Sequence, residues 1–231
     1  MRMSRCSWHG RNVKMADYKY ILMCGGDYEK WTKPRQLTKI NGEPIVARTI
    51  RLLRQCGVTD IVISSNNPVF ETFGVPVLHH ANPFRVYEEC GTTMSSGHWS
   101  DGFYPTFEPA CYLFGDVVFS PNAIKTIVET ETDSIEFFAS ARPFGEGYTK
   151  PYEEPFAFKV KNQKAFREAI ETLNKNRGKF NRTPIAWELW QVIKGTEPNV
   201  ILRNYTVIND YTCDIDSEVD IERFTWIDTR C

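Results

Sequence analysis

No part of the sequence is apolar for long enough to cross a lipid bilayer. Its apolar runs, such as residues 61–64 and 110–114, are far shorter than the roughly 20 residues that a membrane-spanning helix needs. The segment 1–17 contains several Arg, Lys and His residues and lacks the apolar centre of a secretion signal. We therefore expect residues 1–17 to be an N-terminal extension, with a natural start near Met15, and we expect no membrane partner.

The sequence also lacks a pattern that would pair its cysteines. The seven cysteines are odd in number, widely spaced and contain no Cys-x-x-Cys motif. His79 and His80 have no Cys or His at zinc-ligand spacing, so we interpret them as structural. Reduced thiols are typical of the cytoplasm, and a cytoplasmic location is our expectation.

Neither sign of charge dominates. The 231 residues include 28 Lys and Arg against 29 Asp and Glu, a formal net charge of −1. This balance gives no general electrostatic attraction to nucleic acid, so any anion site must be local. The sequence has no Gly-x-Ser-x-Gly motif and no Cys–His arrangement, which argues against a covalent nucleophile.

Apolar runs that predict strands alternate with stretches of helical periodicity. The expected strands are residues 18–24, 60–65, 75–78, 110–115, 134–141, 151–160 and 200–208. The expected helices are residues 44–56, 121–131, 162–175 and 183–193. Because parallel strands need crossover helices, this alternation predicts an α/β three-layer sandwich with a mainly parallel, Rossmann-like sheet.

The last part of the chain is expected to build on this sheet. We expect the strands at 151–160 and 200–208, with the helices beside them, to form a small antiparallel extension and lid. Trp187 and Trp190 lie on one expected helix and are interpreted as packing residues rather than as a nucleic-acid platform. No repeat or flexible linker divides the chain, so residues 18–231 are expected to form a single domain.

A glycine-containing, basic loop follows the first expected strand. After Met23 come Gly25 and Gly26, and then the cations Lys30, Lys33 and Arg35. Paired glycines let backbone N–H groups approach an anion, and three nearby cations can neutralise a triphosphate. The glycine spacing is neither the Rossmann nor the Walker pattern. The loop is a candidate phosphate site, and a solvated basic loop is the alternative.

Two other segments contain acidic residues that could bind a metal. Residues 113–119 form an apolar segment that presents one carboxylate, Asp116, and ligands of open α/β sheets bind at the carboxyl ends of strands. Asp214 and Asp216 alternate on an extended segment, so both point the same way, which is costly without a nearby cation. Ser217 and Asp220 have the spacing of a helix cap, so we interpret Asp220 as structural. A turn cap for Asp116 and a solvated turn for the pair remain alternatives.

These segments, in this order, resemble the MobA-like and sugar-phosphate nucleotidyltransferases, which have a GT-A-like fold. The resemblance is carried by residues 23–26, 33–37, 41–45, 48–50 and 113–119. Residues 213–222 (CDIDSEVDIE) are similar to the C-terminal motif of choline-phosphate and aminoethylphosphonate cytidylyltransferases. Two departures are visible: Lys30 is the nearest counterpart of the family's loop arginine, and Arg35 replaces a lysine.

The resemblance implies that a nucleoside monophosphate passes from CTP, or secondly UTP, to a small phosphorylated or phosphonate acceptor, with release of pyrophosphate. It implies Mg²⁺ held by Asp116 with Asp214 or Asp216, and a pyrophosphate steadied by the three cations of the loop. The implied nucleotide-binding residues are Met23, Gly25, Gly26, Gly91 and Ser95, and the implied acceptor-binding residues are Arg142, Lys150 and Arg182.

Simpler interpretations remain for part of this set. The small polar residues around Gly91 and Ser95 are also typical of helix caps, and the three acceptor-binding cations are each typical of an exposed surface. Two other functions stay open: a GT-A-type glycosyltransferase that uses a nucleotide-sugar, and an inactive nucleotide-binding regulator. The sequence also leaves a homodimer open as the assembly state.

Overall fold

The computed structural model describes residues 18–25, 31–79, 86–89, 92–95, 99–104, 106–141, 153–180, 184–197, 200 and 204–225. Its centre is a seven-stranded sheet with the order β12-β10-β11-β8-β1-β4-β5. The strands are β1 (Lys19–Met23), β4 (Ile61–Ser64), β5 (Val77–Leu78), β8 (Ala110–Phe114), β10 (Ile135–Ser140), β11 (Pro155–Val160) and β12 (Thr206–Ile208). Every pairing is parallel except the two that β11 makes with β8 and β10.

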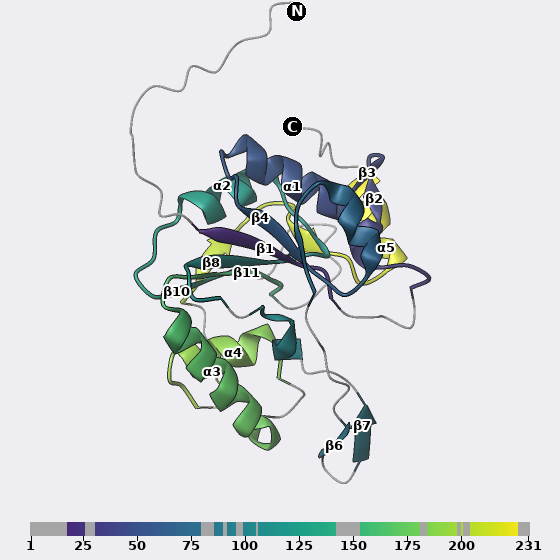
Figure 1. Cartoon of the computed structure of the whole chain (residues 1–231). Helices are drawn as coiled ribbons and strands as arrows, with labels where there is room; N and C mark the ends of the chain where they lie inside the picture. The colour runs from purple at the N-terminus through teal and green to yellow at the C-terminus, as the bar shows by residue number, and fades with distance from the viewer. Residues whose placement is uncertain are drawn as a thin grey trace, which may run out of the picture.

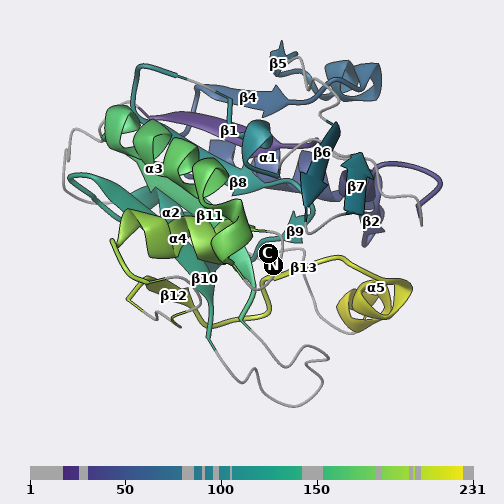
Figure 2. The ribbon, with the colours of Figure 1, turned by 90° about the horizontal axis from the view of Figure 1, so that it is seen from below.

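Helices cover both faces of this sheet (Figure 1). One face is covered by α1 (Ile45–Gln55) and α2 (Pro121–Glu129), and the other by α3 (Gln163–Lys175) and α4 (Ala186–Ile193). Figure 2 shows α3 and α4 in front of the sheet, seen from below. A separate apolar cluster fills each of the two interfaces. The three-layer α/β sandwich predicted from the alternation of strands and helices is therefore confirmed.

Three short antiparallel pairs surround the main sheet. They are β2 (Lys39–Ile40) with β3 (Glu43–Pro44), β6 (Val86–Glu89) with β7 (Thr92–Ser95), and β9 (Val117–Val118) with β13 (Cys213–Asp214). The remaining elements are α5 (Glu218–Thr225) and the 3₁₀ turns η1 (Arg35–Leu37), η2 (Pro68–Phe73), η3 (Trp99–Gly102) and η4 (Arg177–Lys179). The β9–β13 pair positions the candidate site, because it joins the segment that follows Asp116 to the segment that contains Asp214.

The strand expected at 151–160 has a different place from the expected extension. It is β11, and it lies inside the main sheet between β8 and β10. The reason is that Phe156, Ala157, Phe158 and Val160 are all fully buried, so both faces of the strand lie in the interior. A strand of this kind belongs in a sheet interior, covered on both sides.

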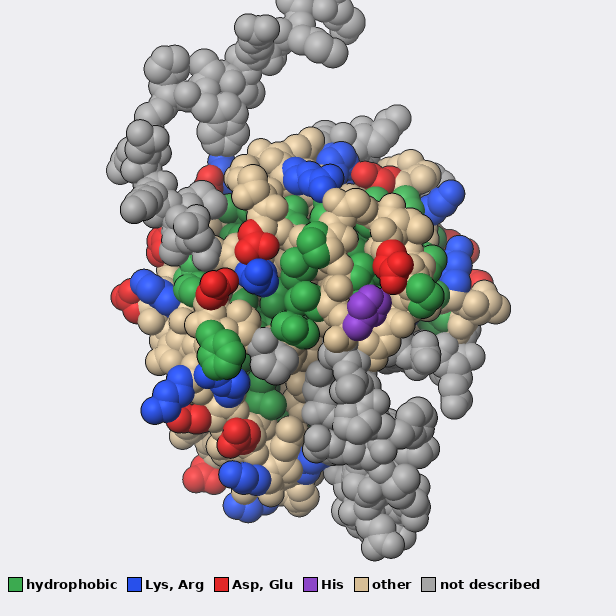
Figure 3. Space-filling model, viewed as in Figure 1, with side chains coloured by type: hydrophobic (Ala, Val, Ile, Leu, Met, Phe, Trp, Pro, Cys, Tyr) green, Lys and Arg blue, Asp and Glu red, His purple; other side chains and the backbone are tan. Residues whose placement is uncertain are grey.

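The tryptophans of α4 support that layer. Trp190 is fully buried and Trp187 packs edge-on against Phe137 with ring centroids 5.0 Å apart, so the packing interpretation is confirmed. Within the described residues, no helix is both long and apolar enough to pass through a membrane. On the face that Figure 3 shows, acidic and basic side chains of these residues are interspersed rather than gathered by sign.

A buried arginine ties α1 to the segments that follow β9 and β12. Arg48 is 2% exposed, and it donates from Nε and Nη2 to the carbonyl oxygen of Phe119 at 3.3 and 3.2 Å. Its Nη2 also donates to the hydroxyl of Tyr211 at 3.0 Å. Because Phe119 follows β9 and Tyr211 precedes β13, this one side chain holds both segments against α1.

We expect Arg48→Met to lower the free energy of unfolding by about 2–3 kcal/mol, since it removes buried hydrogen bonds from a charged donor. Urea unfolding followed by circular dichroism measures this. The matched control is Arg51→Met on the same helix, where a partly exposed pair with Glu43 is expected to contribute about 0–1 kcal/mol. Equal, small losses in both variants would contradict the tethering role.

Candidate functional site

The carboxyl edge of the central strands brings several charged segments together. β1 and β8 run side by side and end at Met23 and Phe114, and Asp116 follows two residues after Phe114. β11 runs the other way, so its first residues enter at this same edge, with Glu154 just before the strand. Ligands of open α/β sheets bind at such an edge, which makes it the candidate site.

Gly115 permits the closest approach at this edge. Its N–H donates to the carbonyl oxygen of Met23 at 3.0 Å. A Cβ at Gly115 would lie 2.6 Å from that oxygen and 2.7 Å from the Sγ of Cys24, which is closer than real Cβ atoms come. The missing side chain therefore lets the turn with Asp116 rest directly on the end of β1.

Arg35 connects two of the predicted aspartates. It opens η1, and its Nη2 lies 2.6 Å from Oδ2 of Asp116. Its Nη1 lies 2.6 Å from Oδ1 of Asp216 and donates to the carbonyl oxygen of Ile215 at 2.8 Å. The Arg35 side chain is only 10% exposed, so water screens these contacts less than on an open surface. The guanidinium therefore binds two aspartates that lie about 80 and 180 residues away from it in sequence.

Three carboxylates form a compact acidic cluster beside this bridge. Glu154, Asp214 and Asp216 each offer an oxygen, and these oxygens lie within 4.8 Å of one another. The pairing of β13 with β9 places Asp214 opposite Val117, and the N–H of Ile215 donates to the carbonyl oxygen of Asp116 at 3.0 Å. Asp214 and Asp216 thus face one place, as their alternation predicts.

The donor set of the acidic cluster fits a hard divalent cation. Mg²⁺ takes oxygen ligands at about 2.1 Å, so ligands on opposite sides of the ion lie about 4.2 Å apart. The oxygens of the cluster all lie within 4.8 Å of one another, which is close to this value. Glu154, Asp214 and Asp216 could therefore hold such an ion after a small contraction, with Asp116 next to them across Arg35.

Glu154 is the candidate ligand that sequence reasoning missed. It is 4% exposed, and its backbone N–H donates to Oγ of Ser140 at 2.7 Å while its carbonyl oxygen accepts from the N–H of Ser140 at 2.9 Å. The sequence signal that could have found Glu154 is a carboxylate placed just before a largely apolar strand. Using this signal requires the direction of β11, which the sequence does not give.

The turn after Asp216 is fixed by a helix cap. The carboxylate of Asp220 accepts from the N–H groups of Asp216 and Ser217 at 3.0 and 2.8 Å and from the Ser217 hydroxyl at 2.9 Å. These bonds satisfy donors at the start of α5. The interpretation of Asp220 as structural is confirmed, and its cap holds Asp216 in place.

The structure describes only some of the remaining predicted residues. Met23 ends β1, Gly25 is exposed just after it, and Lys33 is exposed just before η1. Ser95 ends β7, for which only the backbone is described. The residues outside the described ranges are Gly26, Lys30, Gly91, Arg142, Lys150 and Arg182. The loop, base and acceptor roles of this set stay predictions.

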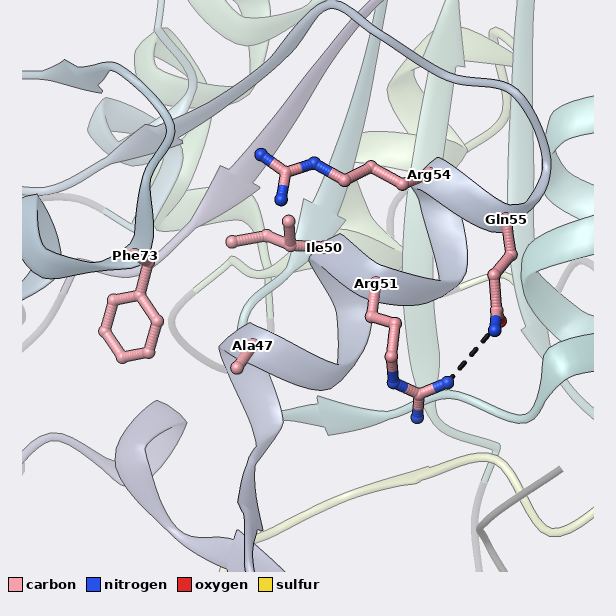
Figure 4. Close-up of a pocket in the computed structure, with 6 residues that line it drawn as sticks. All are labelled: Ala47, Ile50, Arg51, Arg54, Gln55 and Phe73. Carbon is pink, nitrogen blue, oxygen red and sulfur yellow. Dashed lines mark hydrogen bonds between the residues drawn. The ribbon is translucent and has the colours of Figure 1, made fainter.

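A separate hollow of about 400 Å³ lies on the outer side of α1, against η2 (Figure 4). Its lining residues are Ala47, Ile50, Arg51, Arg54, Gln55 and Phe73. Arg51 bonds both oxygens of Glu43 at 2.9 and 2.8 Å, and Arg54 donates to the carbonyl oxygen of Gly74 at 3.1 Å. Because its cations already have protein partners and its lining has no carboxylate, the hollow is a weaker candidate than the acidic edge.

Comparisons with known proteins identify one matching family. Residues 20–187 match the sequence model of the family described as the MobA-like NTP transferase domain. No curated protein matches the sequence significantly.

Three solved structures share the fold. The inositol-1-phosphate CTP transferase from T. maritima has 13% identity and a TM-score of 0.57, over 91% of this chain and 96% of that chain. A protein from Bacillus anthracis assigned as a glucose-1-phosphate thymidylyltransferase has 17% identity and a TM-score of 0.56, over 90% and 93%. The 4-diphosphocytidyl-2C-methyl-D-erythritol synthase from Anaerococcus prevotii has 10% identity and a TM-score of 0.57, over 92% and 96%. At these identities the likeness shows the fold alone.

We expect Gly115→Ala to lower the free energy of unfolding by about 1–3 kcal/mol, because its methyl group collides with the backbone at Met23. Urea unfolding measures the loss. Gly178→Ala in η4 is the matched control, since a Cβ there meets nothing within 4 Å. A Gly115→Ala protein as stable as this control would show that the close approach is dispensable.

Proposed function

This chain belongs to the family of MobA-like NTP transferase domains, and we propose that it transfers a nucleoside monophosphate from a triphosphate to a small phosphorylated or phosphonate acceptor. The leaving product is pyrophosphate. The observation that carries this proposal is the meeting of Asp116, Arg35 and the acidic cluster at the carboxyl edge of the sheet. Such an edge offers both anionic ligands for a metal and a cation for phosphate oxygens.

Magnesium is the cofactor that we propose for the acidic cluster. Glu154, Asp214 and Asp216 would hold it, and Asp116 stays a proposed further ligand. When bound, the ion supplies neutralisation of phosphate charge and polarisation at the α-phosphorus. The carboxylates determine where the positive charge of the ion would lie, because they are held at strand ends and before a capped helix.

The reaction needs no nucleophile from the protein. An oxygen of the acceptor phosphate attacks the α-phosphorus, a new P–O bond forms, and the bond to the bridging oxygen breaks as pyrophosphate leaves. A phosphate acceptor is already ionised near neutral pH, so no general base is required. Burial, and then the charge of Asp116, raise the pKa of the nearby Cys24 thiol well above its usual value, which makes it a poor nucleophile.

The basic segment around the start of η1 is the proposed binding site of the leaving pyrophosphate. Arg35 can grip two phosphate oxygens with its planar fork, and Lys33 lies exposed on the same segment. Together with Lys30 they are the proposed stabilisers of pyrophosphate. Backbone N–H groups around Gly25 and Gly26 are the proposed contacts of the triphosphate.

The choice of base and acceptor rests on the similarity of residues 213–222 to cytidylyltransferases. We propose CTP first and UTP second, with Met23, Gly91 and Ser95 near the base. The proposed acceptor contacts are Arg142, Lys150 and Arg182. We propose that the enzyme acts in the cytoplasm.

We expect purified protein to release pyrophosphate from a triphosphate when Mg²⁺ and pooled phosphate monoesters are supplied, and Asp116→Asn to reduce this rate by roughly 100-fold or more. The substitution removes a charge from the site and adds no bulk. Asp133→Asn is the control, because the side chain of Asp133 is fully exposed and forms a surface ion pair with Lys161, away from the acidic cluster.

Full activity of Asp116→Asn would remove Asp116 from the site. Turnover of a nucleotide-sugar without pyrophosphate release would instead identify a glycosyltransferase. Binding of triphosphate with no turnover of any acceptor would identify a nucleotide-binding regulator.

We expect CTP with Mg²⁺ to raise the thermal stability more than UTP, and both more than ATP or GTP. A ligand that binds only the native state, at 100 times its Kd, adds about 2.7 kcal/mol to the free energy of unfolding. Thermal-shift titrations with each triphosphate, repeated without Mg²⁺ as the control, measure the ranking. A clear preference for a purine nucleotide would overturn the base assignment and leave the metal and phosphate roles standing.

A further inference from the structure

The guanidinium of Arg35 lies where the proposed function requires a metal and a triphosphate to meet. Its two terminal nitrogens reach different aspartates, Asp116 and Asp216, each at 2.6 Å. Asp216 is also a member of the acidic cluster with Glu154 and Asp214. One carboxylate is therefore shared between the guanidinium and the candidate metal site.

Four carboxylates at this edge favour a neighbouring cation. Four carboxylates, those of Asp116, Glu154, Asp214 and Asp216, converge there, and Glu154 is almost fully buried. Like charges held together in a partly buried place are costly without a positive charge among them. Arg35 supplies that charge, and because an arginine stays protonated it can leave only by moving away.

We propose that Arg35 is the built-in counter-ion of the metal-free site, and that it and a divalent cation compete for Asp216. Metal binding would displace the guanidinium from Asp216. The displaced guanidinium would then bind the oxygens of a polyphosphate. This inference deepens the proposed function and rests on it for the identity of the polyphosphate. The competition itself is a property of the carboxylates and Arg35.

Two consequences follow for ligand binding. The metal alone should bind weakly, because it must displace a guanidinium held by two aspartates and the carbonyl oxygen of Ile215. The metal with pyrophosphate should bind more tightly, because the phosphate oxygens give the displaced guanidinium a new partner. Coupling of this kind is reciprocal, so metal should tighten pyrophosphate binding by the same factor. Metal and triphosphate would thus load together.

The test is direct titration with Mn²⁺, followed by the electron paramagnetic resonance signal of the free ion, with and without pyrophosphate. We expect Arg35→Gln to bind Mn²⁺ about 10-fold more tightly than wild type when pyrophosphate is absent, within the usual range of coupling factors. We expect the tightening by pyrophosphate to shrink in this variant. Arg51→Gln, which removes an arginine from a surface pair with Glu43, should behave as wild type.

Two further variants make the result specific. Glu154→Gln should weaken Mn²⁺ binding about 10-fold, within the range found when a ligand set is disturbed, and so assign the measured ion to the acidic cluster. Arg35→Lys keeps the charge but loses the fork, so its Mn²⁺ affinity should fall between those of wild type and Arg35→Gln. It provides the comparison if Arg35→Gln fails to fold.

Equal or weaker Mn²⁺ binding in both Arg35 variants would overturn the proposal and show that Arg35 holds the carboxylates in position for the metal. This outcome is distinct from failure of the proposed function. In that case no triphosphate would yield pyrophosphate with wild-type protein, whatever the Mn²⁺ titrations show.

Discussion

The contact between Gly115 and the end of β1 is the constraint on which the charged edge depends. The N–H of Gly115 bonds the carbonyl oxygen of Met23, and no side chain fits between them. This contact sets how closely the turn that carries Asp116 approaches β1. Asp116 then forms an ion pair with Arg35. A larger residue at this position would move one end of that ion pair, so backbone packing decides the electrostatics of the site.

Behind this edge, hydrogen bonds to buried or partly buried groups keep the distant segments in register. Arg48 holds the carbonyl of Phe119 and the hydroxyl of Tyr211, which lie just outside β9 and β13. β13 then pairs with β9, and Asp220 caps the helix that follows. Backbone pairing and this cap thus hold Asp214 and Asp216 in place, and Arg35 reaches them through a long side chain. A cation on a long side chain beside carboxylates held in this way is the arrangement that the proposed exchange of partners needs.

Much of the fold and part of the site follow from local sequence patterns. The alternation of apolar runs and helical periodicity predicts the layered α/β fold, because each pattern reports the burial of its own segment. The same reasoning places Asp116 at a strand end, points Asp214 and Asp216 the same way and makes Asp220 a cap. Membership of the nucleotidyltransferase family agrees with the resemblance seen in residues 23–26, 33–37 and 113–119.

The sequence by itself therefore determined the main strands and helices, the layered α/β arrangement and the carboxylates near strand ends, because these depend on neighbours within a few residues. Only the tertiary structure decided which charges meet. The direction of β11 brings Glu154 to the acidic cluster, and the packing of η1 brings Arg35 to aspartates about 80 and 180 residues away. Contacts over such separations arise from how strands pair and helices pack, and no local pattern specifies them.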